Sequence, residues 1–361
     1  MASRITNSSA IKTLGNSAAL GQSFFLEEDD LSELAFCAVV KHYFAAVTEV
    51  LRHTPSLQTL EMYLFGTGIP SLLTETIHTL PIVSVTISRP GQFYGGESLE
   101  SPHRRRGVTP SVSDLLLIAR HCPNLVNLSS AFDDREPMAT DFAKQLQTNC
   151  PHLTSLELRF YPSPEWLEEN NNLPLCLGTL QCRLRSLILH NIYLRPEQVL
   201  LMKSLEILVL TFSHTPALPY SFHFVGADRL ERLVLNGSQC QCVFQRCANL
   251  TLVDIGECKV DGISVVFEDC PCLEHVCLSS NVWEETDGVI GTIHNCGKLE
   301  EIYTNFPILI SECSAIQEIR AHTVSPEDLK GITNLRVVEF TCMSFSAVLY
   351  FSSGVRFGLF P

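Results

Sequence analysis

Apolar residues recur along most of the chain in one spacing, in which an apolar residue is followed by two others three and five positions later. We number these positions 0, 3 and 5. Residues 250–258 and 273–281 are two clear copies. Because a frame that returns in order along a chain marks an internal repeat, the pattern predicts a stack of similar structural units. Twelve copies begin 17 to 31 residues apart, with one interval of 43, at Leu57, Ile82, Leu125, Leu153, Leu184, Leu205, Leu230, Leu250, Leu273, Leu299, Ile316 and Leu335.

Each copy predicts a short β-strand, because residues two apart in a strand point to the same face. Positions 3 and 5 then point into the core, position 0 lies inward at the preceding bend, and position 4 points outward. At position 8, Cys258 and Asn281 are expected to turn inward and satisfy backbone groups where the strand ends. Three copies lack an apolar residue at position 5 and carry Ser130, Thr304 and Ala321 there.

Many of the fifteen cysteines follow the same frame. A thiol that recurs at one level of a repeat predicts a buried stack, since free cysteine packs as a small hydrophobe. An odd number of cysteines in a chain of 361 residues does not indicate a disulfide scaffold, so we expect reduced thiols and a cytoplasmic or nuclear location. The cysteines that lie three residues before position 0 are Cys122, Cys150, Cys247, Cys270, Cys296 and Cys313.

The segments between the strands predict short helices where apolar residues have helical spacing. Residues 31–52 predict a longer helix at the start of the repeats. In regions 205–250 and 299–335 the connectors are short or irregular, and turns or 3₁₀ pieces are expected there. The connectors with a helical pattern are 114–122, 140–147, 260–270 and 286–296.

The frame with its preceding Cys-Pro-x-Leu resembles the cysteine-containing leucine-rich repeats of F-box proteins, best at residues 122–153 and 250–299. The resemblance implies an α/β solenoid of horseshoe shape, with parallel strands on the concave face and short helices or turns on the convex face. Residues 28–53 contain no Leu-Pro start of an F-box. The expected organisation is a disordered or flexible N-terminal tail at 1–27, a leucine-rich-repeat solenoid of about twelve units at 28–342, and an apolar C-terminal tail or cap at 343–361.

Composition narrows the function classes. A formal net charge of −14 disfavours nucleic acid as a partner, because phosphate binding needs a basic surface. No apolar run reaches the roughly 18 to 20 residues of a membrane span, so no membrane partner is expected. Arg104–Arg106 fit a solvated loop tip.

The candidates for chemistry are weak. Cys240, Cys242 and Cys247 are close in sequence, but they lack the paired Cys-x-x-Cys clusters of structural zinc. Cys122 follows His121, yet it occupies the buried repeat level. Phosphate-binding loops and metalloprotease or hydrolase motifs are not found in the sequence. We therefore predict no catalytic residue, no metal site and no cofactor.

The outward position 4 is the predicted binding surface. Its mixture of acidic and apolar side chains predicts a protein partner with basic and apolar features. The leading interpretation is a non-enzymatic interaction scaffold. The family resemblance implies an alternative, the substrate-recognition subunit of a cullin-RING (SCF-type) ubiquitin ligase. The third interpretation is a thiol- or zinc-dependent enzyme. The candidate partner-binding residues are Glu61, Glu157, Ile188, Val209, Asp254, Tyr303 and Glu339, with Thr86, Val234 and Cys277 at the same position of other copies.

Overall fold

In a computed structural model, the protein divides into two compact units. The first lies within Met1–Trp166 and Cys176–Leu180, and the second within Leu167–Leu175 and Gln181–Pro361. The structure describes residues 33–63, 69–88, 111–133, 141–161, 182–212, 220–237, 240–258, 264–280, 291–304, 308–321, 334–342 and 345–350, with single residues at 175, 177, 180 and 332. The predicted turns at Asn281 and Arg104–Arg106 therefore lie outside the described residues, as does the side chain of Cys258.

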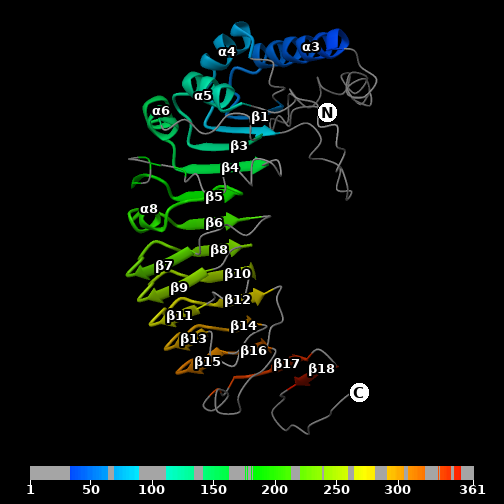
Figure 1. The fold of residues 1–361 in the computed structure, drawn as a ribbon. Helices are drawn as coiled ribbons and strands as arrows, with labels where there is room; N and C mark the ends of the chain where they lie inside the picture. The colour runs from blue at the N-terminus through cyan, green and yellow to red at the C-terminus, as the bar shows by residue number, and fades with distance from the viewer. Residues whose placement is uncertain are drawn as a thin grey trace. The chain divides into compact units, whose positions relative to one another are not determined.

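The first unit alternates helices with strands, and its four strands pair in chain order, all parallel (Figure 1). Neighbouring helices pack on one another, α3 on α4, α4 on α5 and α5 on α6. The helices predicted at 31–52, 114–122 and 140–147 are confirmed as α3, α5 and α6. The elements are α3 (Glu33–Arg52), β1 (Thr59–Tyr63), α4 (Ser71–His78), β2 (Ser84–Ser88), α5 (Val112–His121), β3 (Asn127–Asp133), α6 (Phe142–Asn149) and β4 (Ser155–Tyr161).

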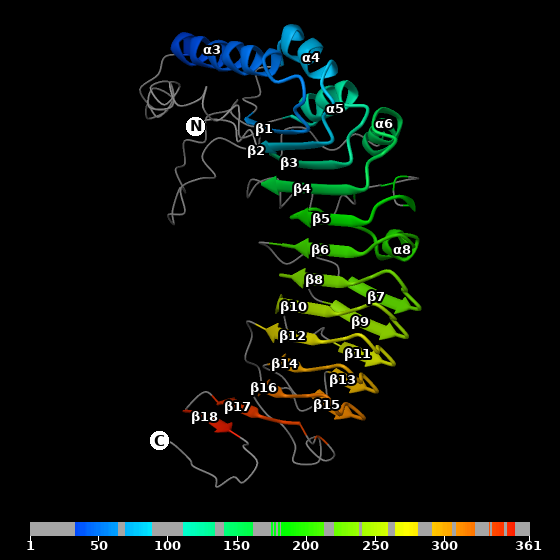
Figure 2. The same cartoon turned by 180° about the vertical axis from the view of Figure 1, so that it is seen from behind.

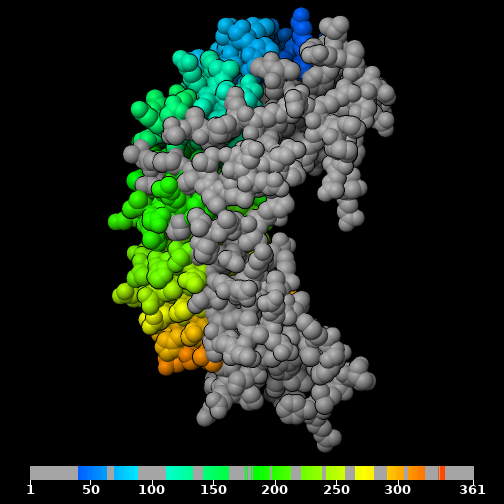
Figure 3. Space-filling model, viewed as in Figure 1, coloured from blue at the N-terminus to red at the C-terminus, as the bar shows by residue number. Residues whose placement is uncertain are grey.

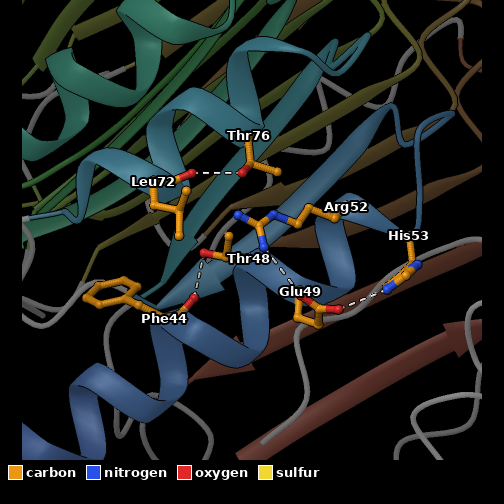
Figure 4. Close-up of polar contacts among 7 residues, drawn as sticks. All are labelled: Phe44, Thr48, Glu49, Arg52, His53, Leu72 and Thr76. Atoms are coloured by element: carbon orange, nitrogen blue, oxygen red, sulfur yellow. Dashed lines mark hydrogen bonds and ion pairs between the residues drawn. The ribbon is translucent and has the colours of Figure 1, made fainter.

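Local side-chain bonds help to fix these helices. Ser111 begins α5 with a capping box: its hydroxyl accepts the Asp114 N–H at 3.0 Å, and the Asp114 side chain accepts from the Ser111 N–H. In α3, the Thr48 hydroxyl donates to the Phe44 carbonyl at 2.7 Å, and Glu49 forms exposed ion pairs near the end of the helix (Figure 4). The apolar face of each helix is buried, which anchors the helix to the core of the unit.

The second unit contains a main sheet built from one strand of each of its copies, with β18 added after the last copy. Its strands are parallel up to β17, and β18 then pairs antiparallel with β17. A short helix, α8 (Pro196–Leu200), lies between the first two strands. The main-sheet strands are β5 (Ser186–His190), β6 (Ile207–Thr211), β8 (Arg232–Asn236), β10 (Leu252–Cys258), β12 (His275–Ser280), β14 (Glu301–Thr304), β16 (Glu318–Ala321), β17 (Val337–Cys342) and β18 (Phe345–Tyr350).

A second parallel sheet lies in the connectors of this unit, between successive main-sheet strands (Figure 2). The helices predicted at 260–270 and 286–296 are therefore wrong in their described parts, since those parts are β11 and β13. Strands also replace the turns or 3₁₀ pieces expected in the shorter connectors. This sheet pairs in chain order: β7 (Tyr220–Val225), β9 (Cys240–Gln245), β11 (Ser264–Glu268), β13 (Gly291–His294) and β15 (Ile308–Ser311).

The second sheet forms because its connectors carry buried apolar residues at alternate positions, which is the period of a β-strand. In β11, Val265 and Phe267 point into the core and are fully buried, whereas Val266 lies between them on the outer face and is half-buried. β-Branched residues favour a pleated strand over a helix, and each new strand finds a paired neighbour in the preceding unit. The atoms of these strands are visible at the surface in the space-filling view (Figure 3).

The two sheets of the second unit enclose an aromatic stack. Phe222, Phe224, Phe244 and Phe267 come from three successive strands of the second sheet, and at most 5% of each is exposed. The ring centroids of successive pairs are 5.6, 5.3 and 5.0 Å apart, with nearly parallel planes in the last two pairs. Offset stacking of this kind adds to the hydrophobic gain of burial.

A left-handed residue ends each strand of the second sheet. Gly226 has φ 62° after β7, and the non-glycine residues Arg246, Asp269, Asn295 and Glu312 adopt φ values of 51° to 56° at the corresponding places. The backbone N–H of Arg246 donates to the Glu268 carbonyl of the next unit at 2.9 Å. In the four turns with a non-glycine residue the next residue is a buried cysteine, so in these units the turn and the thiol layer are one structural feature.

The predicted frame is confirmed at the level of burial. In eleven of the twelve copies the residues at positions 0, 3 and 5 are at most 4% exposed, including Ser130, Thr304 and Ala321. In the twelfth copy Leu335 is half-buried, and the side chains of Val338 and Phe340 lie outside the described set. The architecture of the described residues is thus α/β, with repeated parallel strands and few helices.

Candidate functional site

The residues at position 4 lie in register on the outer face of each unit's main sheet. In the first unit, Glu61 pairs with Thr86, Thr86 with Ser129, and Ser129 with Glu157. All four are half-buried. The predicted residues Glu61 and Glu157 are therefore the two ends of one row across four strands.

The second unit has a longer row, which we call the outer row. Every adjacent pair in it is a register pair between neighbouring strands. This brings together the five predicted residues that belong to this unit, although the side chain of Glu339 lies outside the described ones. The outer row consists of Ile188, Val209, Val234, Asp254, Cys277, Tyr303, Arg320 and Glu339.

Two row members, Ser129 and Arg320, are absent from the sequence prediction. Both belong to copies without a large apolar residue at position 5, next to Ser130 and Ala321. The signal was present, because counting four residues from Leu125 and Ile316 leads to them. Arg320 changes the chemistry of the row, since it is a cation within a surface predicted to be acidic and apolar.

One end of the outer row is apolar. Ile188 and Val209 are half-buried, and Val234 is 6% exposed. Two neighbours on the same face, Ile207 and Leu252, precede the row by two residues in their own strands and are also half-buried. These five side chains make an apolar area on β5, β6, β8 and β10, in which the exposed Arg232 lies between Ile207 and Leu252.

The middle of the row is acidic and aromatic. Cys277 lies between Asp254 and Tyr303, and the Tyr303 side chain is 46% exposed. Burial, followed by the nearby Asp254 carboxylate, raises the pKa of the Cys277 thiol to about 12. Beside this group, Glu301 accepts from His275 Nδ1 at 3.2 Å.

Arginines form ion pairs with one acid in a row, Glu157, and with one acid beside a row, Glu318. Arg159 lies 2.5 Å from Glu157 in the first unit, and Arg320 lies 2.5 Å from Glu318 in the second. Exposed pairs of this kind add little stability, but they reduce the negative charge presented to a partner. Glu157 therefore offers less negative charge than its position in the sequence suggested.

The outer face of the second sheet forms polar bonds within itself. Gln245 donates to Glu268 at 2.7 Å, and His294 lies 2.9 Å from Ser311. Each pair joins side chains on neighbouring strands, so these polar groups hydrogen-bond to one another along one row. On the main-sheet face, by contrast, the apolar groups lie at one end of the outer row and the acidic groups lie in its middle.

The predicted buried thiol layer is confirmed. The six cysteines that precede position 0 are at most 4% exposed. Cys150 donates to the Ala119 carbonyl at 3.3 Å and Cys247 to the Phe224 carbonyl at 3.5 Å, so the thiols bond to the backbone of the preceding unit. These cysteines form part of the core of the repeat.

The thiol candidates Cys122 and Cys242 are both buried. Burial raises the pKa of the Cys122 thiol to about 12, with Cys150 adding to the effect, which opposes thiolate formation. His121 instead packs edge-on against His78, with ring centroids 5.7 Å apart. Cys242 is fully buried beside the aromatic stack, and the side chain of Cys240 lies outside the described set. Among the described residues, no group of three or more His, Cys, Asp and Glu side chains is arranged to hold a metal ion.

In the part of the chain that the structure describes, no helix combines the length and the apolar character needed to cross a bilayer. Neither a family model nor a curated protein matches this chain.

Proposed function

We propose that the chain is a non-enzymatic protein-interaction scaffold of the leucine-rich-repeat type, a horseshoe-shaped solenoid that binds a protein partner through position 4 of its strands. The observation that carries the proposal is the outer row, which aligns an apolar area with an acidic and aromatic one. Register pairing makes this alignment a property of the sheet rather than of flexible loops.

The dimensions of the row favour a macromolecular partner. Neighbouring strands are about 4.8 Å apart, so the seven steps from Ile188 to Glu339 span roughly 34 Å. A small ligand is usually enclosed by a cleft, whereas a protein surface of this length matches a typical interface. An open sheet face with exposed Tyr303 at its middle suits a protein interface, in which aromatic residues are enriched.

Proximity labelling from the full chain in cells tests the proposal. We expect Val209→Arg and Asp254→Lys, both in the outer row, to remove the same specific partners from the labelled set. The control is Glu268→Lys, a charge reversal on the outer face of the second sheet, which should keep them. A partner list that is unchanged by both main-sheet variants would contradict the proposal.

A second candidate is the substrate-recognition subunit of a cullin-RING ubiquitin ligase. The buried cysteine that recurs before position 0 favours it, because this layer carries the resemblance to F-box repeat proteins. Co-purification of the full chain with a cullin and its adaptor is the test. Recovery of the chain without either component argues against this role.

A further inference from the structure

We infer, on the basis of the proposed interaction function, that the outer row binds an extended segment of a partner protein with apolar side chains at one end and a lysine or arginine about four residues away. The apolar side chains of the segment lie over Ile188 and Val209, and its basic side chain lies over Cys277. These three residues all belong to the second unit.

The apolar half of the row gives the first anchor. Ile188 and Val209 lie in register with Val234, and Ile207 and Leu252 widen the apolar area on the same face. Covering these partly exposed aliphatic groups removes apolar surface from water, which favours aliphatic side chains in the partner. A charged side chain placed here would lose its hydration without a partner of opposite charge.

The next part of the row gives the cation site. The described side chains on the outer face of β10, β12 and β14 include no lysine or arginine, whereas they include Asp254, Glu301 and Tyr303. Asp254 and Tyr303 are each one strand from Cys277, a step of about 4.8 Å. A lysine or arginine side chain centred over Cys277 is therefore within reach of both the carboxylate and the aromatic ring.

The distance between the two anchors sets the spacing of the segment. Three strand steps separate Val209 from Cys277, which is about 14 Å at 4.8 Å per step. An extended chain advances about 3.3 Å per residue, so about four residues span this distance. The segment then runs across the strands, along the row.

Two arginines on the main-sheet face, Arg232 and Arg320, determine which part of the outer row can take the partner's cation. Arg232 lies on the same face between Ile207 and Leu252, so it repels a cation brought to the apolar end. Arg320 follows Tyr303 in the row, but it is paired with Glu318 at 2.5 Å, so its charge is largely compensated. Among the described side chains of the outer row, a partner cation thus has one favourable place, over Cys277.

The test uses a phage-displayed library of random dodecapeptides, selected on the full immobilised chain. Selected peptides are then synthesised with a fluorophore, and their affinities are measured by fluorescence anisotropy. We expect the selected peptides to contain a pair of apolar residues, with a Lys or Arg three to five residues before or after the pair. Val209→Arg and Asp254→Lys should each weaken binding at least tenfold, whereas Val266→Arg on the outer face of the second sheet should leave it unchanged.

A charge exchange makes the result specific. Replacing the peptide's basic residue with glutamate should weaken binding to the wild type and restore part of the binding to Asp254→Lys. If selected peptides lose affinity with Val209→Arg but carry no basic residue or ignore Asp254→Lys, the inference is wrong while the interaction surface stands. If no peptide is selected, or if binding is unaffected by both variants, the proposed function fails with it.

Discussion

Replacing Phe244 with alanine should produce the largest loss of stability among single changes in the aromatic stack. The side chain is fully buried, and its ring stacks on Phe224 at 5.3 Å and on Phe267 at 5.0 Å. Truncation of a buried phenylalanine costs about 3 to 5 kcal/mol, and each aromatic pair adds about 0.5 to 1.5 kcal/mol beyond its area. Because both neighbours lose a ring contact, we expect Phe244→Ala to cost about 5 kcal/mol. Phe244→Leu keeps most of the apolar volume and should cost about 1 to 3 kcal/mol, the value of the two lost ring pairs.

Urea unfolding followed by circular dichroism measures these differences, and amide hydrogen exchange in β9 and β11 locates them. Val243→Ala is the matched control, since Val243 is the half-buried, outward neighbour in the same strand. Its replacement should cost about 1 kcal/mol, within the range of strand propensities. If Phe244→Ala and Val243→Ala have the same free energy of unfolding, the assignment of inward and outward residues in the second sheet is wrong.

Three further outcomes follow from single features of the repeats. Ser130 is 2% exposed, and among the described residues its hydroxyl is the buried side-chain group that has no hydrogen-bond partner. Ser130→Ala should therefore raise the free energy of unfolding, measured by urea titration, by about 1 kcal/mol. Gly226 and Gly237 both have positive φ, but only at Gly237 would a Cβ overlap a main-chain carbonyl oxygen. In thermal unfolding, Gly226→Ala should therefore lower the free energy of unfolding by about 1 kcal/mol and Gly237→Ala by about 3 kcal/mol. Cys182 is exposed, whereas burial raises the pKa of Cys122 to about 12. Iodoacetamide at pH 8 should therefore modify Cys182 before Cys122 in the folded chain, as read by peptide mass spectrometry. Equal rates at both thiols would show that Cys122 is not buried.

The sequence was sufficient for the strands of the main sheet because their signal is local and repeated. A strand period of two fixes which residues enter the core once one apolar frame is known. Even Ser130 and Thr304, which break the apolar rule, were placed in the frame by their neighbours and are buried in the structure. The register of the outer row follows in the same way, since every copy begins its strand at the same position.

The second sheet was harder to predict because its strands depend on their neighbours. The segment 114–122 is rich in leucine and became a helix, whereas 264–268 has two valines and became a strand. Both patterns allow a buried face in a short helix, and only pairing with the preceding unit decides the outcome. The ion pair of Arg159 with Glu157 was also invisible in the frame, because it joins side chains two residues apart on the outer face of one strand.

The most direct test of the proposed binding face compares two outward residues of nearly equal exposure in the second unit. Tyr303 lies in the outer row and is 46% exposed, and Leu309 lies on the outer face of the second sheet and is 47% exposed. Each is replaced in turn by benzoylphenylalanine in the full chain, and cross-linked products are compared after irradiation in cells. We expect a discrete protein adduct from position 303, lost on adding Asp254→Lys, and no such adduct from position 309. An adduct from position 309 alone, or equal adducts from both positions, would contradict the assignment of the outer row as the binding surface.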